Sequence, residues 1–525
     1  MNQQQALTQL RQLIEALQDE RLFEHRVQRF EVIETHISIV LLTGDYAYKF
    51  KKPVDFGFVD FTTLDKRRYY CEEELRLNRR LAPQIYLQVV AVGGSVDNPV
   101  FDGSLAIEYA VGMRQFPQSA ELEHALAADV VGQQDFAALA RDIAAFHANA
   151  AAAGPASLFG TTEAVQRQCL DNFETMGGGL ESPDLAAELQ SLRQWTAAEI
   201  DHCRDVLSQR HDNGYVRECH GDMHVTNMIW LDDRIQVFDC IEFNDAFRWI
   251  DTMSEIAFLL MDLDMRDRAD LAHVFLNAYL EAGGDYAGLA LLRLFRVYRS
   301  LVRAKIAYLR AGQDNQDTSL PQRFASHVRL ACDYMQAGQS PCLIITRGFS
   351  GSGKTTITAG LIPLTGAVRV RSDVERKRLE GLSADGRSHS GIGQGLYDAS
   401  HTEQTYERLA DCAQSVIRAG LPVIVDATFL QAEQRRRFHE LADSLNVPYR
   451  ILECQAPTEV LRERVASRAQ AGRDASEADI EVLERQLATA EDLSADEQPH
   501  AIELDTLATT THDDLAARLG LIAVT

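Results

Sequence analysis

The feature that most constrains this chain of 525 residues is a glycine-rich turn between an apolar strand pattern and a helix pattern. The turn, residues 348–355, reads Gly-Phe-Ser-Gly-Ser-Gly-Lys-Thr and fits G-x-x-x-x-G-K-[ST] in full. Glycines let the backbone N–H groups of such a turn point inward and cradle phosphate oxygens. Lys354 adds a cation for the terminal phosphates of a nucleotide, and the Thr355 hydroxyl can bind Mg²⁺. A chance glycine-rich turn is the alternative, which the flanking strand and helix patterns disfavour. The residues expected to bind the nucleotide are Gly348, Ser350, Gly351, Ser352, Gly353, Lys354, Thr355 and Thr356.

Strand and helix patterns divide the chain into two parts of different fold class. After residue 341, apolar segments at 342–346, 368–371, 423–425, 450–453 and 502–504 alternate with helix patterns. This alternation predicts an α/β domain whose parallel sheet is covered by helices on both faces. Before it, strand patterns, with a hairpin expected within 30–60, precede mainly helical patterns, which predicts an α+β domain of two lobes. The expected parts are an N-terminal helix (1–29), a two-lobed domain (30–335, with lobes of about 30–113 and 114–335), a linker (336–341) and a P-loop domain (342–525).

Two carboxylates follow strands of the expected parallel sheet, where ligands bind in such folds. Asp373 comes just after the strand 368–371 and could accept a proton from an attacking hydroxyl group. Arg376, one helical turn later, could hold an anionic group of the substrate. The alternative for Asp373 is that it only caps the following helix. Asp426 ends the strand 423–425 and is a candidate Mg²⁺ ligand, although a buried structural aspartate is an alternative.

Arginines are concentrated in a helix pattern near residue 465. Arg464 and Arg468 are four residues apart and therefore share one helix face. Such a segment is typical of a lid that brings arginines onto a transferring phosphoryl group, whereas a solvated charged face is the alternative. The arginines are Arg462, Arg464, Arg468 and Arg473, and Asp474-Ala-Ser-Glu477 follows them.

Residues 341–500 resemble the small P-loop kinases that include polynucleotide 5′-kinases, gluconate kinases and zeta-toxin-type kinases. The matching pieces are the P-loop, Ser372-Asp373-x-x-Arg376, Asp426-Ala-Thr428 and the arginine-rich segment. The resemblance implies that Asp373 is the base for the acceptor and that Arg464 and Arg468 contact ATP phosphates. The segment 380–397, which holds five glycines and His389, lies where this group varies, so the acceptor stays open.

A second motif with catalytic spacing lies in the first part of the chain and reads His-Gly-Asp-Met-His-Val-Thr-Asn over residues 220–227. Asp222 could orient or deprotonate an acceptor hydroxyl, and Asn227 could hold Mg²⁺. An apolar segment then ends at Asp239, which could hold the metal that bridges ATP phosphates. Taken singly, Asp222 could cap a turn and Asp239 could simply end a strand. His220 is expected to brace the loop rather than transfer protons.

These residues resemble the aminoglycoside phosphotransferase and choline kinase superfamily, a small-molecule branch of the protein-kinase fold, over roughly residues 30–335. The resemblance implies that Lys49 binds the α- and β-phosphates of ATP. Lys51 is a rival, because alternation places both lysines on one strand face. Glu74 is the expected partner of the lysine, with Glu73 in reserve. A glycine-rich phosphate loop is not obvious, although Thr43-Gly44-Asp45 lies where a minimal one would. His147, where the family often has a histidine, is expected to be packed and structural.

Composition excludes several other classes. A net charge of −25 disfavours nucleic acid as a partner, since phosphate backbones are repelled. The nine cysteines are scattered without a C-x-x-C pair, which indicates reduced residues rather than a zinc site or disulfide framework. Neither a secretory signal nor a membrane-spanning apolar stretch is found, so we expect a cytoplasmic protein.

The sequence therefore predicts a bifunctional kinase that uses ATP and Mg²⁺. Each domain would transfer the γ-phosphate to a hydroxyl group of a small molecule, such as a sugar, a nucleoside or a related metabolite. One alternative is that the P-loop domain phosphorylates nucleic-acid ends or nucleotide-sugars. Another is that one half is a regulatory nucleotide-binding module.

Overall fold

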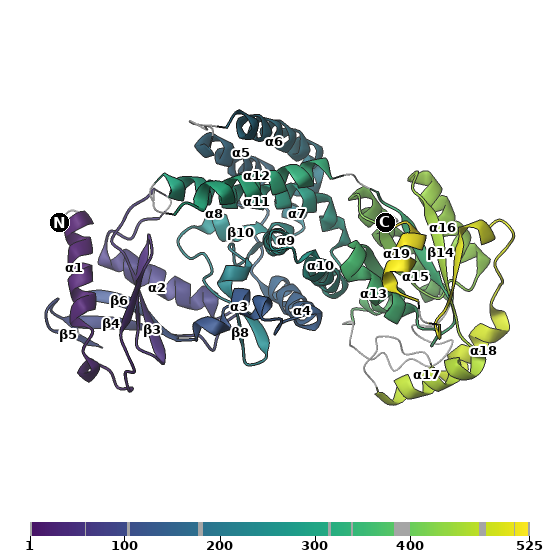
Figure 1. The fold of residues 1–525 in the computed structure, drawn as a ribbon, viewed down its shortest axis with the longest axis horizontal. Coiled ribbons are helices and arrows are strands. Elements are labelled where there is room, and N and C mark those ends of the chain that lie inside the picture. The colour runs from purple at the N-terminus through teal and green to yellow at the C-terminus, as the bar shows by residue number, and fades with distance from the viewer. Residues whose placement is uncertain are drawn as a thin grey trace. The chain divides into compact units, whose positions relative to one another are not determined.

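The computed structural model describes residues 3–57, 59–101, 105–176, 182–312, 317–337, 340–382, 399–471, 479–508 and 510–522, with the backbone alone at 399–400 and 468–471 (Figure 1). The chain divides into two compact units. The first comprises Met1–Asp135, Asn149–Ala164 and Arg210–Leu259, and the second Phe136–Ala148, Val165–Gln209 and Leu260–Thr525.

The first unit is built on an antiparallel sheet of six strands in the order β1-β2-β3-β6-β4-β5. The expected hairpin is confirmed, because β2 pairs with β3 and Val40 lies opposite Lys49. Leu10 and Leu13 of helix α1 belong to the same buried apolar core as Phe50 of the sheet. The bounds are α1 (Gln3–Ala16), β1 (Glu31–Glu34), β2 (Ser38–Leu42), β3 (Tyr46–Lys51), α2 (Leu64–Asn78), β4 (Tyr86–Gly94), β5 (Pro99–Phe101) and β6 (Glu108–Arg114).

The rest of the first unit holds the loop of residues 220–227 between short strands. Strand β7 pairs with β10, and β8 forms a hairpin with β9. The bounds are α3 (Leu122–Ala127), β7 (Val216–Glu218), the 3₁₀ turn η3 (Val225–Asn227), β8 (Met228–Leu231), β9 (Arg234–Val237), α8 (Asp245–Arg248) and β10 (Trp249–Asp251). Helices α4 (Gln133–Asn149), α7 (Arg204–Asp212) and α9 (Thr252–Asp264) each contribute residues to both units.

The second unit combines helices that precede residue 337 with the expected parallel sheet. Apolar side chains of α5, α6, α11 and α12 form one core, which includes Phe173, Leu192, Val297 and Phe324. The bounds are α5 (Thr162–Met176), α6 (Pro183–His202), α10 (Ala269–Gly283), η4 (Tyr286–Leu291), α11 (Leu292–Ala311) and α12 (Leu320–Gln336). Residues 338–339 of the expected linker lie outside the described residues.

The parallel sheet has five strands in the order β12-β13-β11-β14-β15, and every neighbouring pair is parallel, as expected. Strand β11 is buried at every residue, which explains why it begins with three consecutive apolar residues, 343–345, instead of an alternating pattern. The strands are β11 (Leu343–Arg347), β12 (Val368–Arg371), β13 (Val423–Asp426), β14 (Tyr449–Gln455) and β15 (Ala501–Asp505).

Helices cover this sheet and place the motif residues at the carboxyl ends of its strands. Helices α13 and α19 pack on the face that carries Ile344 and Ile424, and α15 and α16 also contact the strands. The helices are α13 (Lys354–Thr365), α14 (Ser372–Leu379), α15 (Ala399–Arg418), α16 (Ala432–Ser444), α17 (Thr458–Ala471), α18 (Ile480–Thr489) and α19 (His512–Leu519). Among the described residues, we find no helix with both the length and the apolar character needed to cross a membrane.

The central strand β11 leads into the glycine-rich turn. A cavity next to this strand should therefore lower the stability of the P-loop sheet. Ile344 has 0% exposed surface, and Ile344→Ala is expected to cost about 2–5 kcal/mol of stability. Hydrogen exchange read by mass spectrometry should then speed up in peptides that cover β11 and β13. Leu507→Ala, at a residue 53% exposed, is the control and should change little. Unchanged exchange in β11 would contradict this account of the core.

Candidate active sites

Two lysines and one glutamate form the buried centre of the first unit. Lys49 Nζ lies 2.8 Å from Glu74 Oε1 and 2.6 Å from Asp239 Oδ1. Lys51 Nζ lies 2.7 Å from Glu74 Oε2 and also pairs with Glu242. Both lysines named in the sequence therefore reach Glu74, but they differ in their second partner. Lys49 is the one that links Glu74 to Asp239, the candidate metal ligand.

The electrostatics of this cluster favour the charged forms. Burial opposes the charge on Lys49, but the carboxylates of Asp239 and Glu74 raise its pKa well above the usual range. Burial also opposes ionisation of Glu74, yet the two ammonium groups lower its pKa. Glu74 has 0% exposed surface, so its charge depends on these two partners. Glu73 instead pairs with Arg76 on the same helix.

The loop of residues 220–227 places Asp222 and Asn227 in direct contact. Asn227 Nδ2 donates to Asp222 Oδ2 at 2.9 Å and to the Asp222 carbonyl oxygen at 3.0 Å. The Asn227 amide oxygen is then the atom that can bind a cation. His224 Nε2 lies 3.3 Å from Asp222 Oδ2 while its ring packs edge-on against Phe258, which fits a structural role for this histidine.

The β8–β9 hairpin brings Asp239 to the same loop. Met228 pairs with Val237 in the hairpin, and the backbone N–H of Phe238 donates to the Asn227 carbonyl oxygen at 3.0 Å. Asn227 and Asp239 therefore flank the base of one hairpin. Asp239 has φ of 62°, a left-handed conformation that an aspartate tolerates better than most residues.

Buried groups brace this loop from behind. The Glu255 carboxylate accepts hydrogen bonds from the backbone N–H groups of His220, at 2.5 Å, and Gly221, at 3.0 Å. His220 Nε2 lies 2.9 Å from the Phe238 carbonyl oxygen, and burial lowers the pKa of this histidine. The geometry is that of a brace, as the sequence suggested. In the second unit, His147 is buried with its Nδ1 2.9 Å from the Tyr279 hydroxyl, which fits the packed role expected for it.

The glycine-rich turn of the second unit has the backbone geometry of a phosphate cradle. Gly351 and Gly353 have φ of 83° and 91°, values that favour glycine. A Cβ atom at Gly348 would come within 2.5 Å of the Cys454 carbonyl oxygen, so a side chain cannot be accommodated there. Lys354 Nζ curls over the turn and donates to the carbonyl oxygens of Gly348 and Phe349, both at 2.8 Å.

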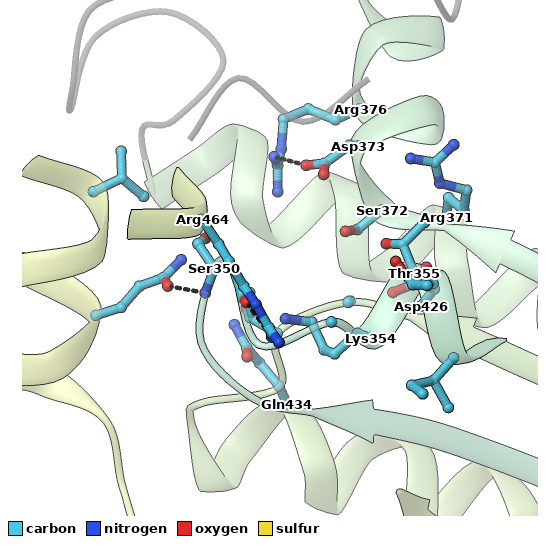
Figure 2. Close-up of a pocket in the computed structure, with 18 of the residues that line it drawn as sticks. Ser350, Lys354, Thr355, Arg371, Ser372, Asp373, Arg376, Asp426, Gln434 and Arg464 are labelled. Atoms are coloured by element: carbon cyan, nitrogen blue, oxygen red, sulfur yellow. Dashed lines mark hydrogen bonds and ion pairs between the residues drawn. The ribbon is translucent and has the colours of Figure 1, made fainter. Parts of the chain in front are cut away.

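A pocket of about 530 Å³ opens above this turn (Figure 2). Asp426 lies 5% exposed at the end of β13, and its Oδ2 accepts from the Thr358 hydroxyl at 3.4 Å. Arg376 pairs with Asp373 Oδ1 at 3.1 Å, an ion pair that Figure 2 shows within the pocket. The lining includes Ser350, Gly351, Gly353, Lys354, Thr355, Thr356, Arg371, Ser372, Asp373, Arg376, Asp426 and Arg464.

The described arginine side chains of helix α17 have different partners. Arg464 points into the pocket and donates to the Gly351 carbonyl oxygen and the Thr506 hydroxyl, both at 3.2 Å. Arg462 pairs instead with Glu484 of α18 on an exposed face. The Arg468 side chain, Arg473 and the segment Asp474–Glu477 lie outside the described residues, as does His389.

Several pocket and cluster residues were missed by the sequence analysis. Gln486 of α18 accepts a hydrogen bond from the Ser350 backbone N–H at 2.8 Å, so it contacts the phosphate turn directly. Gln434 and Tyr406 also line the pocket, and Glu242 is the second partner of Lys51. No local motif marks these residues, because only the folded chain brings them to the sites.

Comparisons with known proteins match two parts of the chain to two family models. Residues 70–292 match the model of a family described as "Phosphotransferase enzyme family", and residues 343–493 match one described as "AAA domain". The chain is a fusion of two kinase-type domains. We call them the phosphotransferase-family domain and the P-loop domain. The chain is an enzyme of the kinase class.

Relatives and solved structures match parts or most of this chain. Proteins of Mycobacterium tuberculosis and Mycobacterium bovis, both described as uncharacterized, are 29% identical over 450 residues, which is 85% of this chain and 88% of each relative. A choline/ethanolamine kinase family protein from Mesorhizobium loti covers 63% of this chain and 95% of its own, with 12% identity and a TM-score of 0.39. A gluconokinase from Sinorhizobium meliloti covers 35% of this chain and 93% of its own, with 19% identity and a TM-score of 0.25.

Mutation of the two lysines of the phosphotransferase-family domain should cost different amounts of stability. Lys51 is 1% exposed, so Lys51→Met leaves Glu242 unmatched in a buried place and should destabilise this unit by about 3–5 kcal/mol. Lys49→Met should cost clearly less, because Lys51 still matches Glu74 and the Asp239 side chain is 45% exposed. Urea unfolding followed by tryptophan fluorescence in a Trp195→Phe background measures both, since the remaining Trp230 and Trp249 belong to this unit.

Lys66→Met, at an exposed pair with Asp60, is the matched control and should change the unfolding midpoint little. An equal or larger loss of stability in Lys49→Met than in Lys51→Met would contradict the assignment of Lys51 as the structural lysine.

Proposed function

We propose that the chain is a bifunctional kinase whose two domains each transfer the γ-phosphate of ATP to a hydroxyl group of a small molecule. The proposal rests on the observation that each unit carries a lysine and two aspartates at its candidate site. In the first unit these are Lys49, Asp222 and Asp239, and in the second they are Lys354, Asp373 and Asp426.

In the phosphotransferase-family domain, Asp222 orients or deprotonates the acceptor hydroxyl. Its 33% exposed side chain, held by Asn227, is open to an acceptor. Lys49, fixed by Glu74, binds the α- and β-phosphates. The oxygen donors Asn227 and Asp239 suit Mg²⁺, which prefers carboxylate and amide oxygens. When bound, Mg²⁺ would offset the negative charge of the phosphates.

In the P-loop domain, backbone N–H groups of the glycine-rich turn and Lys354 bind the phosphates of ATP. Thr355 and Asp426 supply oxygen atoms suited to Mg²⁺. Asp373 takes the proton of the acceptor hydroxyl, Arg376 orients an anionic part of the acceptor, and Arg464 and Arg468 contact the phosphates. The enzyme works mainly by positioning and by charge stabilisation, as is usual in phosphoryl transfer.

A small acceptor is favoured over a nucleic acid by the pocket size at the P-loop site and by the net charge of the chain as a whole. The pocket volume of about 530 Å³ lies in the range usual for small-molecule sites, and ATP would occupy part of it. A net charge of −25 repels a phosphate backbone. We therefore propose a sugar, a nucleoside or a related metabolite as the acceptor, and the cytoplasm as the place of action.

Product analysis with one variant per site tests the proposal. The pure protein is incubated with ATP, Mg²⁺ and a metabolite extract, and phosphorylated products are identified by mass spectrometry. Asp222→Asn should reduce one product by about 10²–10⁴-fold, because it removes the acceptor base. Lys354→Ala should abolish a different product, because it removes the cation at the phosphates.

Matched controls are Asp232→Asn, in the exposed β8–β9 turn, and Lys66→Ala, which should leave both products unchanged. If Asp222→Asn spares every product, the first domain is not a kinase. If both variants lose the same product, one domain is a regulatory module instead. Salt-dependent labelling of an oligonucleotide 5′ end that is lost in Lys354→Ala would replace the small-molecule acceptor of the P-loop domain by a nucleic acid.

A further inference from the structure

Helix α10, which lies within residues 70–292 of the phosphotransferase-family match, packs against the P-loop sheet inside the second unit. It lies along β12, the edge strand. The Asn277 side-chain amide donates to the Ala367 carbonyl oxygen at 3.0 Å and accepts from the Arg369 backbone N–H at 2.8 Å. This side chain therefore satisfies backbone groups of the edge strand, as a neighbouring strand would.

One turn further along α10, Glu281 binds two arginines of β12. Arg371 NH1 donates to Glu281 Oε1 at 2.8 Å, and Arg369 NH2 donates to Oε2 at 3.3 Å. The two arginine side chains are 13% and 11% exposed, and Glu281 is 22% exposed. One carboxylate of α10 thus orients two guanidinium groups at the end of β12.

Both arginines lie at the P-loop pocket or contact residues next to it. Arg371 lines the pocket itself. Arg369 NH1 donates to the Thr355 carbonyl oxygen at 3.1 Å, in the first turn of α13. It also lies 3.5 Å from the Thr358 hydroxyl, which donates to Asp426 at 3.4 Å. Glu281 is therefore connected to the candidate metal ligands through one arginine and to the pocket through the other.

The end of α10 also anchors the helices that carry the acceptor side of the pocket. Arg378 of α14 donates to the carbonyl oxygens of Glu281, at 2.5 Å, and Ala282, at 3.2 Å. Arg408 of α15 donates to the Gly284 carbonyl oxygen at 3.2 Å. Cations suit this place, because the end of a helix carries partial negative charge. The helix that begins with Ser372 and Asp373 is thus held by α10.

We propose that Glu281 is a positioning residue for phosphoryl transfer in the P-loop domain, supplied by the phosphotransferase-family part of the chain. It holds Arg371 in the lining of the pocket, and it holds Arg369 on the first turn of α13. The inference rests on the proposed kinase function of the P-loop domain. On this proposal, a helix that falls within the phosphotransferase-family match supports the acceptor side of the P-loop pocket.

Loss of this carboxylate would redirect the arginines. Burial opposes ionisation of Arg371. The carboxylates of Glu281, Asp426 and Asp373, in decreasing order of effect, nevertheless raise its pKa. With Glu281 neutral, the attraction of Asp426 and Asp373 for Arg371 is no longer opposed by Glu281. An arginine bound to Asp373 would weaken the proposed base for the acceptor.

The test uses the full chain and measures the product that depends on Lys354. Glu281→Gln should lower kcat for that product by about 10- to 100-fold, because reacting groups lose alignment. The KM for Mg·ATP and the product that depends on Asp222 should stay unchanged. Glu199→Gln is the matched control, since Glu199 is 12% exposed and pairs with Arg293 at 3.0 Å on helices away from β12. It should leave kcat unchanged.

A double-mutant cycle with Arg371→Gln separates positioning from general destabilisation. If Glu281 acts through Arg371, the double variant should be no slower than the slower single variant. The inference would be overturned if the losses of the two single variants multiplied in the double variant. Full activity in Glu281→Gln would also overturn it. If no product depends on Lys354 at all, the proposed function of the P-loop domain fails instead, so the two failures are distinct.

Discussion

Buried carboxylates matched by basic side chains are the interactions on which both candidate sites depend. Glu74 and Glu375 each have 0% exposed surface. Glu74 is matched by two lysines, and Glu375 accepts from Arg378 and Arg408. An unmatched charge in such a place would cost several kcal/mol, so these side chains have few alternative arrangements. Each buried carboxylate therefore fixes a strand or helix that carries a reactive group.

Three of the four candidate reactive carboxylates have a more exposed environment than the structural ones, whereas Asp426 is 5% exposed. The side chains of Asp222, Asp239 and Asp373 are 33%, 45% and 27% exposed. They can exchange partners with a metal or a substrate at low cost, whereas Glu74 cannot. At these three positions, candidate reactive charges are separate from the charges that hold the fold. This separation connects packing to function in both units.

Local patterns predicted much of the fold, and distant partners explain what they missed. The strands of the P-loop sheet and the glycine-rich turn were predictable because each is encoded within a few consecutive residues. Alternation could not choose between Lys49 and Lys51, since both reach Glu74. The difference lies in Glu242, 191 residues from Lys51 in sequence. The link between Glu281 and Arg371 likewise spans 90 residues and follows no motif.

The central claim is that each domain binds its own magnesium nucleotide, and binding stoichiometry tests it most directly. Isothermal titration of the intact chain with Mg²⁺ and a non-hydrolysable ATP analogue should give two nucleotides per chain. Lys354→Ala and Asp239→Asn should each remove one of them and leave the other unchanged. A single nucleotide per chain, or none, would contradict the account.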